Sequence, residues 1–457
     1  MTEAIGSRKP GEWLKTTTPL PELDLGRLNM RISTDRYTSR EYQERERKQI
    51  WMQTWQIAGR TDELPEVGDW KEYRIFDQSY VVVRGSDGAL SGFVNACRHR
   101  GNALCRGKGR TARFTCPYHL WTFGLDGRLI GVGRPDLVGP INKEEHGLLA
   151  VRVDSFAGFI FINPNPEAAP LAEFLGREVM AGLAPYRLDE MTPVGMDVRE
   201  SLECNWKVVM DAFSEGYHII GVHPELLSVI DLEAGNSRHG FYGDHGMAVA
   251  PFEVKNVQAC SLEQQVEGIR ALPGTFPTVA EVLPLFEASI AAHRNHEGKL
   301  QFPAGVTVRA LLQQATRASL TRKGMNVTGL ADDQMSDSQG WFLFPNFFMT
   351  IRAGEATVIM AAPHPDGDPN RCIWHVTAFM WLPPALRSAH RVQPVDVQVP
   401  GSYPYFLALQ QDYAQMQRQQ QGLRNRRLEH LSLTREEVSI ARFHSVLDRY
   451  LAGGTPA

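Results

Sequence analysis

The 457-residue chain lacks the features that define several large classes of protein. No apolar run approaches the ~20 residues that a membrane-spanning helix needs, so we expect no membrane partner. Residues 1–10 contain no apolar core of a secretory signal. The formal net charge of −4 argues against broad binding to nucleic acid, which needs a basic face. Six cysteines are too few for a disulfide scaffold, so we predict a cytoplasmic protein whose cysteines bind metal or carry a reactive thiol.

In the first half of the chain, an N-terminal arm is followed by a predicted helix and then by predicted short strands. A loose apolar face from Tyr42 to Trp55 predicts an amphipathic helix. From Trp70 to Asn163, short β-branched stretches alternate with Gly and Asp turns, a pattern typical of a small antiparallel β domain. Within it, Phe156–Ile162 has the pattern of one strand that contains Gly158.

The second half begins after Pro164 and has mixed helical and strand patterns. Strands are predicted at 341–351, 357–361 and 373–381, and helices near the C-terminus. We therefore predict three segments: an arm and helix (1–54), a β domain (55–165) and a larger α+β domain (166–457).

Two Cys–His pairs form the first candidate site. Cys97 and His99 are followed, after sixteen residues, by Cys116 and His119. Four such residues at two short spacings rarely coincide by chance in a core, which leaves two kinds of metal site. Common zinc sites with two cysteines and two histidines pair the cysteines first and then the histidines, whereas here each half contributes one of each. That alternation favours a Rieske [2Fe–2S] cluster, with a structural zinc site as the alternative.

The residues around these pairs resemble the Rieske non-haem iron oxygenases, in the terminal oxygenase α subunit of aromatic ring-hydroxylating dioxygenases. The similar stretches are Asn95–Gly101 and Cys116–Trp121, although that family more often has Gly where this chain has Leu120. The resemblance implies an α+β fold. A small antiparallel β Rieske [2Fe–2S] domain would be joined to a larger catalytic domain with a central antiparallel sheet flanked by helices.

His218 and His223 belong to the second candidate site. A helix over Asn205–His223 would place Asp211, Glu215 and His218 on one face. A regular helix points His223 away from that face, so both imidazoles can reach one metal only if the helix distorts or ends between them. Gly221 and Pro224 permit such a break.

Two imidazoles and one carboxylate would form a facial triad that leaves metal positions open to oxygen. The residue order alone does not identify the carboxylate. The family resemblance implies Asp412, on a late helix, ahead of Asp396 as a ligand of a mononuclear Fe(II). It also implies that Glu215 bridges His218 to the cluster histidine of a neighbouring subunit, with Asp211 as the runner-up. Asn205 is implied to lie near the iron.

The resemblance implies an oxidoreductase that hydroxylates an aromatic or related hydrophobic small molecule with O2, by di- or monooxygenation, as in aromatic hydrocarbon catabolism. O- or N-demethylation is the alternative, and an electron-transfer or zinc-binding module without catalysis is the alternative of another class. The chain has no Rossmann glycine fingerprint and no ferredoxin-type cysteine run, so electrons from NAD(P)H must come through a separate reductase, with or without a ferredoxin. Cluster electrons would pass through His119 and Glu215. The resemblance also implies a head-to-tail homotrimer (α3) or an α3β3 assembly.

The substrate is not identified by the sequence. Met210, Phe213, Phe347 and Phe348 suggest a partly apolar cavity, with core packing as the alternative.

Overall fold

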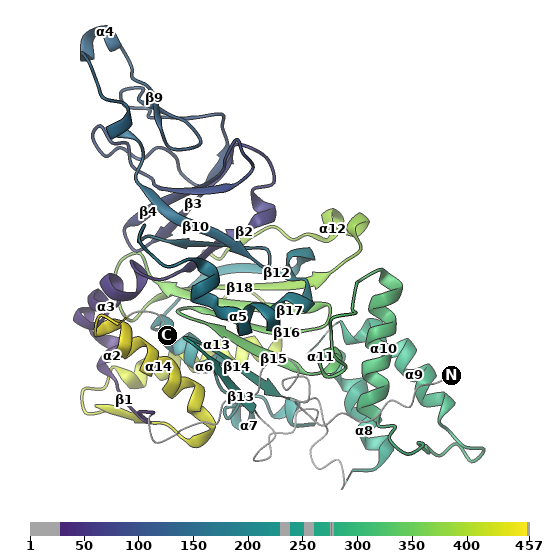
Figure 1. The fold of residues 1–457 in the computed structure, drawn as a ribbon. Helices are drawn as coiled ribbons and strands as arrows, with labels where there is room; N and C mark the ends of the chain where they lie inside the picture. Colours follow the sequence, from purple (N-terminus) through teal and green to yellow (C-terminus); the bar gives the residue numbers. More distant parts are fainter. Residues whose placement is uncertain (1–27, 229–237, 251–259, 275, 277, 455–457) are drawn as a thin grey trace. The chain divides into compact units, whose positions relative to one another are not determined.

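The computed structural model describes residues 28–228, 238–250, 260–274, 276 and 278–454. These residues form two compact units (Figure 1). The small unit contains Arg40–Phe174 and Pro363–Asp368, and the large unit contains the rest of the described chain. Most of the predicted N-terminal arm, up to residue 27, lies outside the described residues. The domain limits 1–54, 55–165 and 166–457 remain predictions.

The small unit begins with a helix and continues as a β sheet. Helix α3 (Arg40–Glu46) runs into a π-helical turn, η2 (Arg47–Trp51), and buries Tyr42, Ile50 and Trp51 as the apolar pattern predicts. The seven strands that follow pair antiparallel throughout. Their order across the sheet is β2 (Gln56–Arg60), β11 (Phe159–Asn163), β10 (Ala150–Phe156), β5 (Leu90–Val94), β4 (Gln78–Arg84), β3 (Asp69–Ile75) and β6 (Lys108–Arg110).

A hairpin replaces the single strand predicted over Phe156–Ile162. Strands β10 and β11 pair directly, with Phe156 opposite Phe159. Ala157 and Gly158 form the turn with φ values of 52° and 81°. Two left-handed residues in a row are typical of the tight turns that match strand twist, so Gly158 reverses the chain rather than continuing a strand.

The core of the small unit holds the two predicted cluster loops in place. A second, three-stranded sheet consists of β7 (Phe114–Thr115), β8 (Thr122–Phe123) and β9 (Leu129–Gly131). Cys97 and Cys116 are buried in one apolar cluster with Trp121, Phe123 and Val81. Packing in this apolar cluster therefore fixes the positions of the two cysteines on their short loops.

The large unit is built on an eight-stranded sheet. Neighbours from β13 to β17 pair antiparallel, β12 is antiparallel to β18, and β12 is parallel to the edge strand β19. The order is β13 (Arg238–Tyr242), β14 (His245–Ala250), β15 (Ser338–Leu343), β16 (Phe347–Arg352), β17 (Glu355–Pro363), β18 (Cys372–Trp381), β12 (Met191–Leu202) and β19 (Val395–Asp396). The strand predicted at 341–351 is therefore two strands of a hairpin, while those at 357–361 and 373–381 are confirmed.

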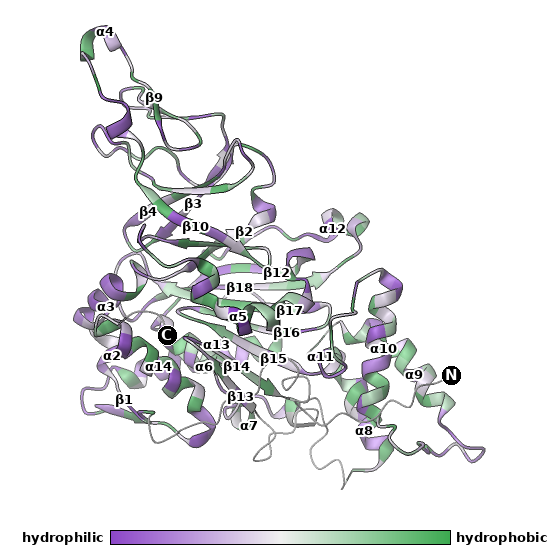
Figure 2. Cartoon of the chain, viewed as in Figure 1, coloured by the Kyte–Doolittle hydropathy of each residue, from purple (hydrophilic) through white to green (hydrophobic). Residues whose placement is uncertain are grey.

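Three helices of the large unit pack together beside this sheet: α6 (Trp206–Phe213), α13 (Leu407–Leu423) and α14 (Val438–Leu451). Helix α6 contacts β16, β18 and α13. The Trp206 ring meets Phe443 of α14 at 5.8 Å, and Phe443 meets Phe342 of β15 at 5.0 Å. Figure 2 shows α14 alternating between hydrophobic and hydrophilic residues, as expected of a helix with one face on a core.

A separate helical cluster consists of α8 (Leu262–Ala271), α9 (Val279–Ala292) and α10 (Val308–Lys323), with its own apolar core. These helices lie within the stretch 224–335, where surface helices were predicted. No helix in the described part of the chain is long and apolar enough to cross a membrane. The β sheets of both units, together with the helices, confirm the predicted α+β class.

Helix α6 is anchored at both ends by buried polar contacts. At its start, the Asn205 side chain accepts a hydrogen bond from the backbone N–H of Lys207 at 3.0 Å. Near its end, the Asp211 carboxylate accepts one from the Tyr37 hydroxyl at 2.6 Å and lies 3.2 Å from His444 Nε2. His444 Nδ1 is buried with no hydrogen-bond partner among the described residues, so this ring makes its polar contacts through Nε2. The network ties two distant segments, those of Tyr37 and His444, to α6.

We predict that Tyr37→Phe destabilises the large unit by roughly 1–3 kcal/mol, because Asp211 and His444 each lose a partner in the core. Urea unfolding followed by tryptophan fluorescence measures the change. Tyr403→Phe is the control, since the Tyr403 hydroxyl has no hydrogen bond to another described residue. Equal unfolding midpoints for the two variants would contradict the anchoring role.

Candidate metal centres

The two cluster loops have matching backbone geometry. In the first loop, Gly101 N–H donates to Cys97 O at 2.9 Å, and in the second, Leu120 N–H donates to Cys116 O at 3.0 Å. Gly101 has a φ of 74° and Leu120 a φ of 59°, so both loops turn through the left-handed region four residues after the cysteine. Leu120 therefore stands at a position that favours glycine, with its side chain exposed.

The four candidate ligands divide into a buried and an outer pair. Cys97 and Cys116 are buried, whereas His99 is exposed and His119 is half-buried, and the two imidazole rings lie 4.6 Å apart in an edge-to-face arrangement. Trp121 stacks on His99 at 4.9 Å and supports that ring. Two thiols on one side and two imidazoles on the other match the donor set of a [2Fe–2S] cluster in which two cysteines bind one iron and two histidines the other.

The protonation of these groups also suits a cluster. Burial raises the pKa of the Cys97 thiol, and the nearby Cys116 adds to the effect. A buried thiolate pair is thus costly without a cation, and a metal offsets that cost. Burial and the neighbouring His99 and Arg100 lower the pKa of His119, which favours the neutral imidazole that binds metal.

The second site brings together two histidines and one carboxylate. One ligand atom from each of His218, His223 and Asp412 lies within 4.8 Å of the others. His223 Nε2 is 2.9 Å and His218 Nε2 3.7 Å from Asp412 Oδ1. His223 and Asp412 are buried, while His218 is partly exposed. Asp396 lies apart, exposed on β19 next to Arg199.

The local backbone explains how both imidazoles reach one point. The continuous helix predicted over Asn205–His223 is wrong, because α6 ends at Phe213 and a second, one-turn helix α7 (Ile219–Val222) follows. His218 precedes this turn, and His223 ends it with φ −124° and ψ 59°. A break was expected between His218 and His223; instead the chain is helical from Ile219 to Val222, the irregular stretch lies before His218, and the helix ends at His223. Gly221 lies inside the turn, and Asp211 and Glu215 do not share a helix.

Each metal-facing imidazole has a partner on its other nitrogen. Glu215 Oε1 lies 2.5 Å from His218 Nδ1, and Gln411 Oε1 lies 2.7 Å from His223 Nδ1. Both contacts place the proton on Nδ1 and leave Nε2 free to bind metal. Gln411 escaped the sequence analysis. Its only signal is its position directly before Asp412, and its contact with His223 spans 188 positions.

The charge balance of the site favours a bound cation. Burial acts to lower the pKa of His223, but the hydrogen bond and charge of Asp412, with help from Gln411, raise it overall. Asp412 thus attracts positive charge to the His223 Nε2 position. Two imidazoles and one carboxylate fit a mononuclear iron, which would take the place of that proton.

Two predicted site residues have their polar contacts elsewhere. Asn205 caps α6, and its amide donates to Pro369 O at 2.6 Å. Asp211 bonds to Tyr37 and His444. Their roles near the iron remain predictions.

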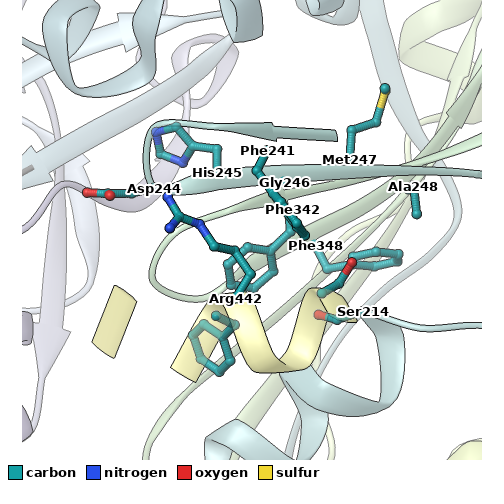
Figure 3. Close-up of a pocket in the computed structure, with 13 residues that line it drawn as sticks. Ser214, Phe241, Asp244, His245, Gly246, Met247, Ala248, Phe342, Phe348 and Arg442 are labelled. Atoms are coloured by element: carbon teal, nitrogen blue, oxygen red, sulfur yellow. The ribbon is translucent and has the colours of Figure 1, made fainter. Parts of the chain in front are cut away.

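A small pocket lies beside the segment that carries the second site (Figure 3). It is lined by Ser214, which directly precedes Glu215, and by residues of β13–β16 and α14. Phe348 lines the pocket, and Phe213 stacks on it at 5.8 Å. Met210 and Phe347 are buried in the core.

Two family descriptions match the chain over these regions. Residues 187–453 match the ring hydroxylating alpha subunit (catalytic domain), and residues 54–140 match the Rieske [2Fe-2S] domain. The chain belongs to the ring-hydroxylating α subunit family, and the resemblance seen in its sequence is confirmed. The cofactors of these domains are a Rieske [2Fe–2S] cluster and a mononuclear iron.

Several known proteins are similar to part of the chain. The glycine betaine monooxygenase oxygenase subunit of Chromohalobacter salexigens is 38% identical over 184 residues, which is 40% of this chain and 41% of that protein. The anthranilate 1,2-dioxygenase large subunit of Burkholderia cepacia is 33% identical over 196 residues, 41% of this chain and 46% of that protein. The matched part thus spans less than half of each of these two relatives.

Solved structures share the fold along nearly the whole chain. A quaternary ammonium Rieske monooxygenase superposes with a TM-score of 0.63 at 19% identity, covering 94% of this chain and 100% of that one. Naphthalene 1,2-dioxygenase with bound indole gives 0.64 at 22% identity, covering 92% of each chain. At these identities the likeness concerns the fold alone.

We predict that Gln411→Ala weakens iron binding roughly 10- to 100-fold, because the His223 ring loses the group that fixes its proton and orientation. Iron retained per chain after dialysis against graded chelator measures the affinity. Gln415→Ala, at an exposed position of the same helix, is the matched control. Equal retention in both variants would show that Gln411 does not position His223.

Proposed function

We propose that the chain is the terminal oxygenase component of a multicomponent Rieske oxygenase. It would be a cytoplasmic protein that hydroxylates a small organic molecule with O2 and electrons from a separate NAD(P)H-dependent reductase, with or without a ferredoxin. The observation that carries this proposal is the convergence of His218, His223 and Asp412 in a chain that also presents two Cys–His pairs. The match over 187–453 favours this function over an electron-transfer Rieske protein or a zinc module.

The residues have distinct proposed tasks. Cys97, His99, Cys116 and His119 would hold the cluster, and His218, His223 and Asp412 the iron. When bound, the cluster supplies electrons and the iron activates oxygen. The chain itself orients the imidazoles through Glu215 and Gln411.

Glu215 is the proposed connection between subunits. Both oxygens of its carboxylate contact His218. Oε1 accepts a hydrogen bond from Nδ1 of the ring, and Oε2 accepts one from the backbone N–H at 3.1 Å. In a head-to-tail assembly it would join this ring to His119 of the partner subunit.

Exposed apolar residues beside both centres support such an assembly. Tyr118 and Leu120, on either side of His119, are 56% and 57% exposed. Tyr217 and Ile220, next to His218, are 50% and 54% exposed. Apolar surface of this kind is typical of interfaces. A repeated contact between unlike faces closes into a ring, in agreement with the α3 or α3β3 assembly inferred from the sequence.

Two reaction types stay open within this function. Ring hydroxylation of an aromatic compound is the first candidate, in line with the predicted role in aromatic hydrocarbon catabolism. Monooxygenation that ends in N- or O-demethylation is the second, and the similarity to a glycine betaine monooxygenase oxygenase subunit favours it.

Oxygen consumption by the holoprotein with an NADH-driven surrogate reductase tests the function. The panel contains aromatic acids, methoxyaromatics, polycyclics and quaternary ammonium compounds. We expect at least one compound to stimulate uptake in step with product, and His223→Ala to abolish product while the visible spectrum of the cluster persists. If no compound of the panel stimulates oxygen uptake that is coupled to product, the proposal is refuted.

We predict that Glu215→Gln lowers product turnover roughly 10- to 100-fold with iron and cluster contents unchanged, because the charged partner of His218 is lost. Stopped-flow reoxidation of the reduced cluster locates the defect. Asp211→Asn is the comparison, since its carboxylate bonds to Tyr37 and His444. A slow reoxidation in Asp211→Asn but not in Glu215→Gln would make Asp211 the bridge.

A further inference from the structure

The chain between β9 and β10 contacts both candidate cluster loops. We call its residues 132–147 the strap. The strap is mostly irregular, with one helical turn, α4 (Pro135–Val138), and one short 3₁₀ turn, η4 (Glu144–His146) (Figure 1). Val132 and Ile141 of the strap pack against the apolar cluster that contains the two buried cysteines. The strap is therefore part of the core that carries the cluster loops.

The second cluster loop lies directly against Gly133 of the strap. A Cβ added at Gly133 would lie 2.4 Å from the carbonyl oxygen of His119 and 3.0 Å from Leu120 Cβ. The φ of Gly133 is outside the left-handed region, so the close approach of the loop, and not the local conformation, requires glycine here. Because the nearer contact is with backbone, a side chain at this position would have to displace the loop or the strap.

The first cluster loop is tied to the other end of the strap. Arg98, which lies between the two candidate ligands of that loop, donates from Nη1 to the carbonyl oxygen of Gly147 at 3.1 Å. Its Nη2 donates to the carbonyl oxygen of Glu145 at 3.4 Å. The two ends of one segment thus hold the two loops that carry the candidate ligands.

A row of three rings connects the strap to His99. The His146 ring meets Trp121 edge-to-face at 5.6 Å, and Trp121 stacks on His99 at 4.9 Å with 8° between the ring planes. His146 is itself oriented, because its Nδ1 donates to the carbonyl oxygen of Asn142 at 2.7 Å. Trp121 is buried, so its position depends on the rings that contact it.

We propose that the strap positions the Rieske cluster, with Gly133 and His146 as its positioning residues. Gly133 acts through the backbone of His119. His146 acts through Trp121 on His99. Together they fix the separation of two imidazoles that bind the same iron, and the apolar side chains around them limit the access of water to it. This inference rests on the proposed function only in that it needs the cluster to be present.

The reduction potential, the EPR spectrum of the reduced cluster and the rate of cluster loss to a chelator test the proposal on the holoprotein. Gly133→Ala should displace the second loop, and His146→Ala removes the ring that contacts Trp121. We expect each variant to lose its cluster roughly 10-fold faster than the native protein and to show shifted EPR g values. The potential should rise, because water that reaches a loosened loop stabilises the negative charge that the added electron brings.

Each substitution has a matched comparison. Gly131→Ala is the control for Gly133→Ala, since Gly131 lies two residues earlier and its φ is also outside the left-handed region. A Cβ there would lie 3.9 Å from Thr122 Cβ, an ordinary contact, so this variant should behave as the native protein does. His146→Phe keeps a ring against Trp121 and should restore most of the native potential and cluster lifetime.

Native potential, g values and cluster lifetime in both Gly133→Ala and His146→Ala would overturn the proposal, as would equal effects of Gly131→Ala and Gly133→Ala. If Gly133→Ala does not assemble a cluster, the comparison of His146→Ala with His146→Phe decides. These measurements need neither substrate nor O2. Strap-dependent potentials without coupled oxygen uptake would therefore refute the oxygenase function and leave the strap standing, and coupled uptake with unchanged potentials would do the opposite.

Discussion

The large unit depends on holding a buried carboxylate within reach of two imidazoles. Asp412 Oδ1 meets His223 Nε2 at 2.9 Å across 189 positions of the chain. Burying that carboxylate is costly unless positive charge or donors surround it. The break after Phe213, the single turn of α7 and the packing of α13 against α6 and α7 all bring those groups together. The irregular backbone in this region is thus a requirement of the site.

Both candidate centres have an enclosed half and an accessible half. In the small unit the thiols are buried and the imidazoles face outwards, and in the large unit His223 and Asp412 are buried while His218 is partly exposed. The enclosed ligands fix position by packing. The outer imidazoles stand where another protein surface can approach, and His119 and His218 have exposed apolar residues close by in the chain. In both centres the buried ligands therefore keep the site rigid, while the outer imidazoles are accessible to a partner protein.

How far the sequence predicts this molecule depends on whether a feature is local. The pairs Cys97/His99 and Cys116/His119 are identified by spacing alone, because each lies on one short loop. Asp412 required a family resemblance, because no local pattern links it to His218. Gln411 was missed for the same reason, although it is adjacent to Asp412 in the chain.

The secondary structure shows the same limit. Strand patterns located the sheets, but two hairpins were interpreted as single strands because their tight turns leave the apolar pattern almost unbroken. The sequence predicts a helix through Glu215 and His218 with a break between His218 and His223, and it does not predict the irregular stretch at Ser214–Tyr217. Tertiary contacts, including the one between Glu215 and His218, decide the geometry there.

Leu120 has a thermodynamic consequence. A leucine with a φ of 59° carries a local conformational cost of about 1–2 kcal/mol that glycine would avoid. An isolated subunit bears that cost with the leucine side chain facing water. If another copy covers the side chain, association offsets the cost by mass action, so the resistance of this loop to local unfolding would increase with protein concentration.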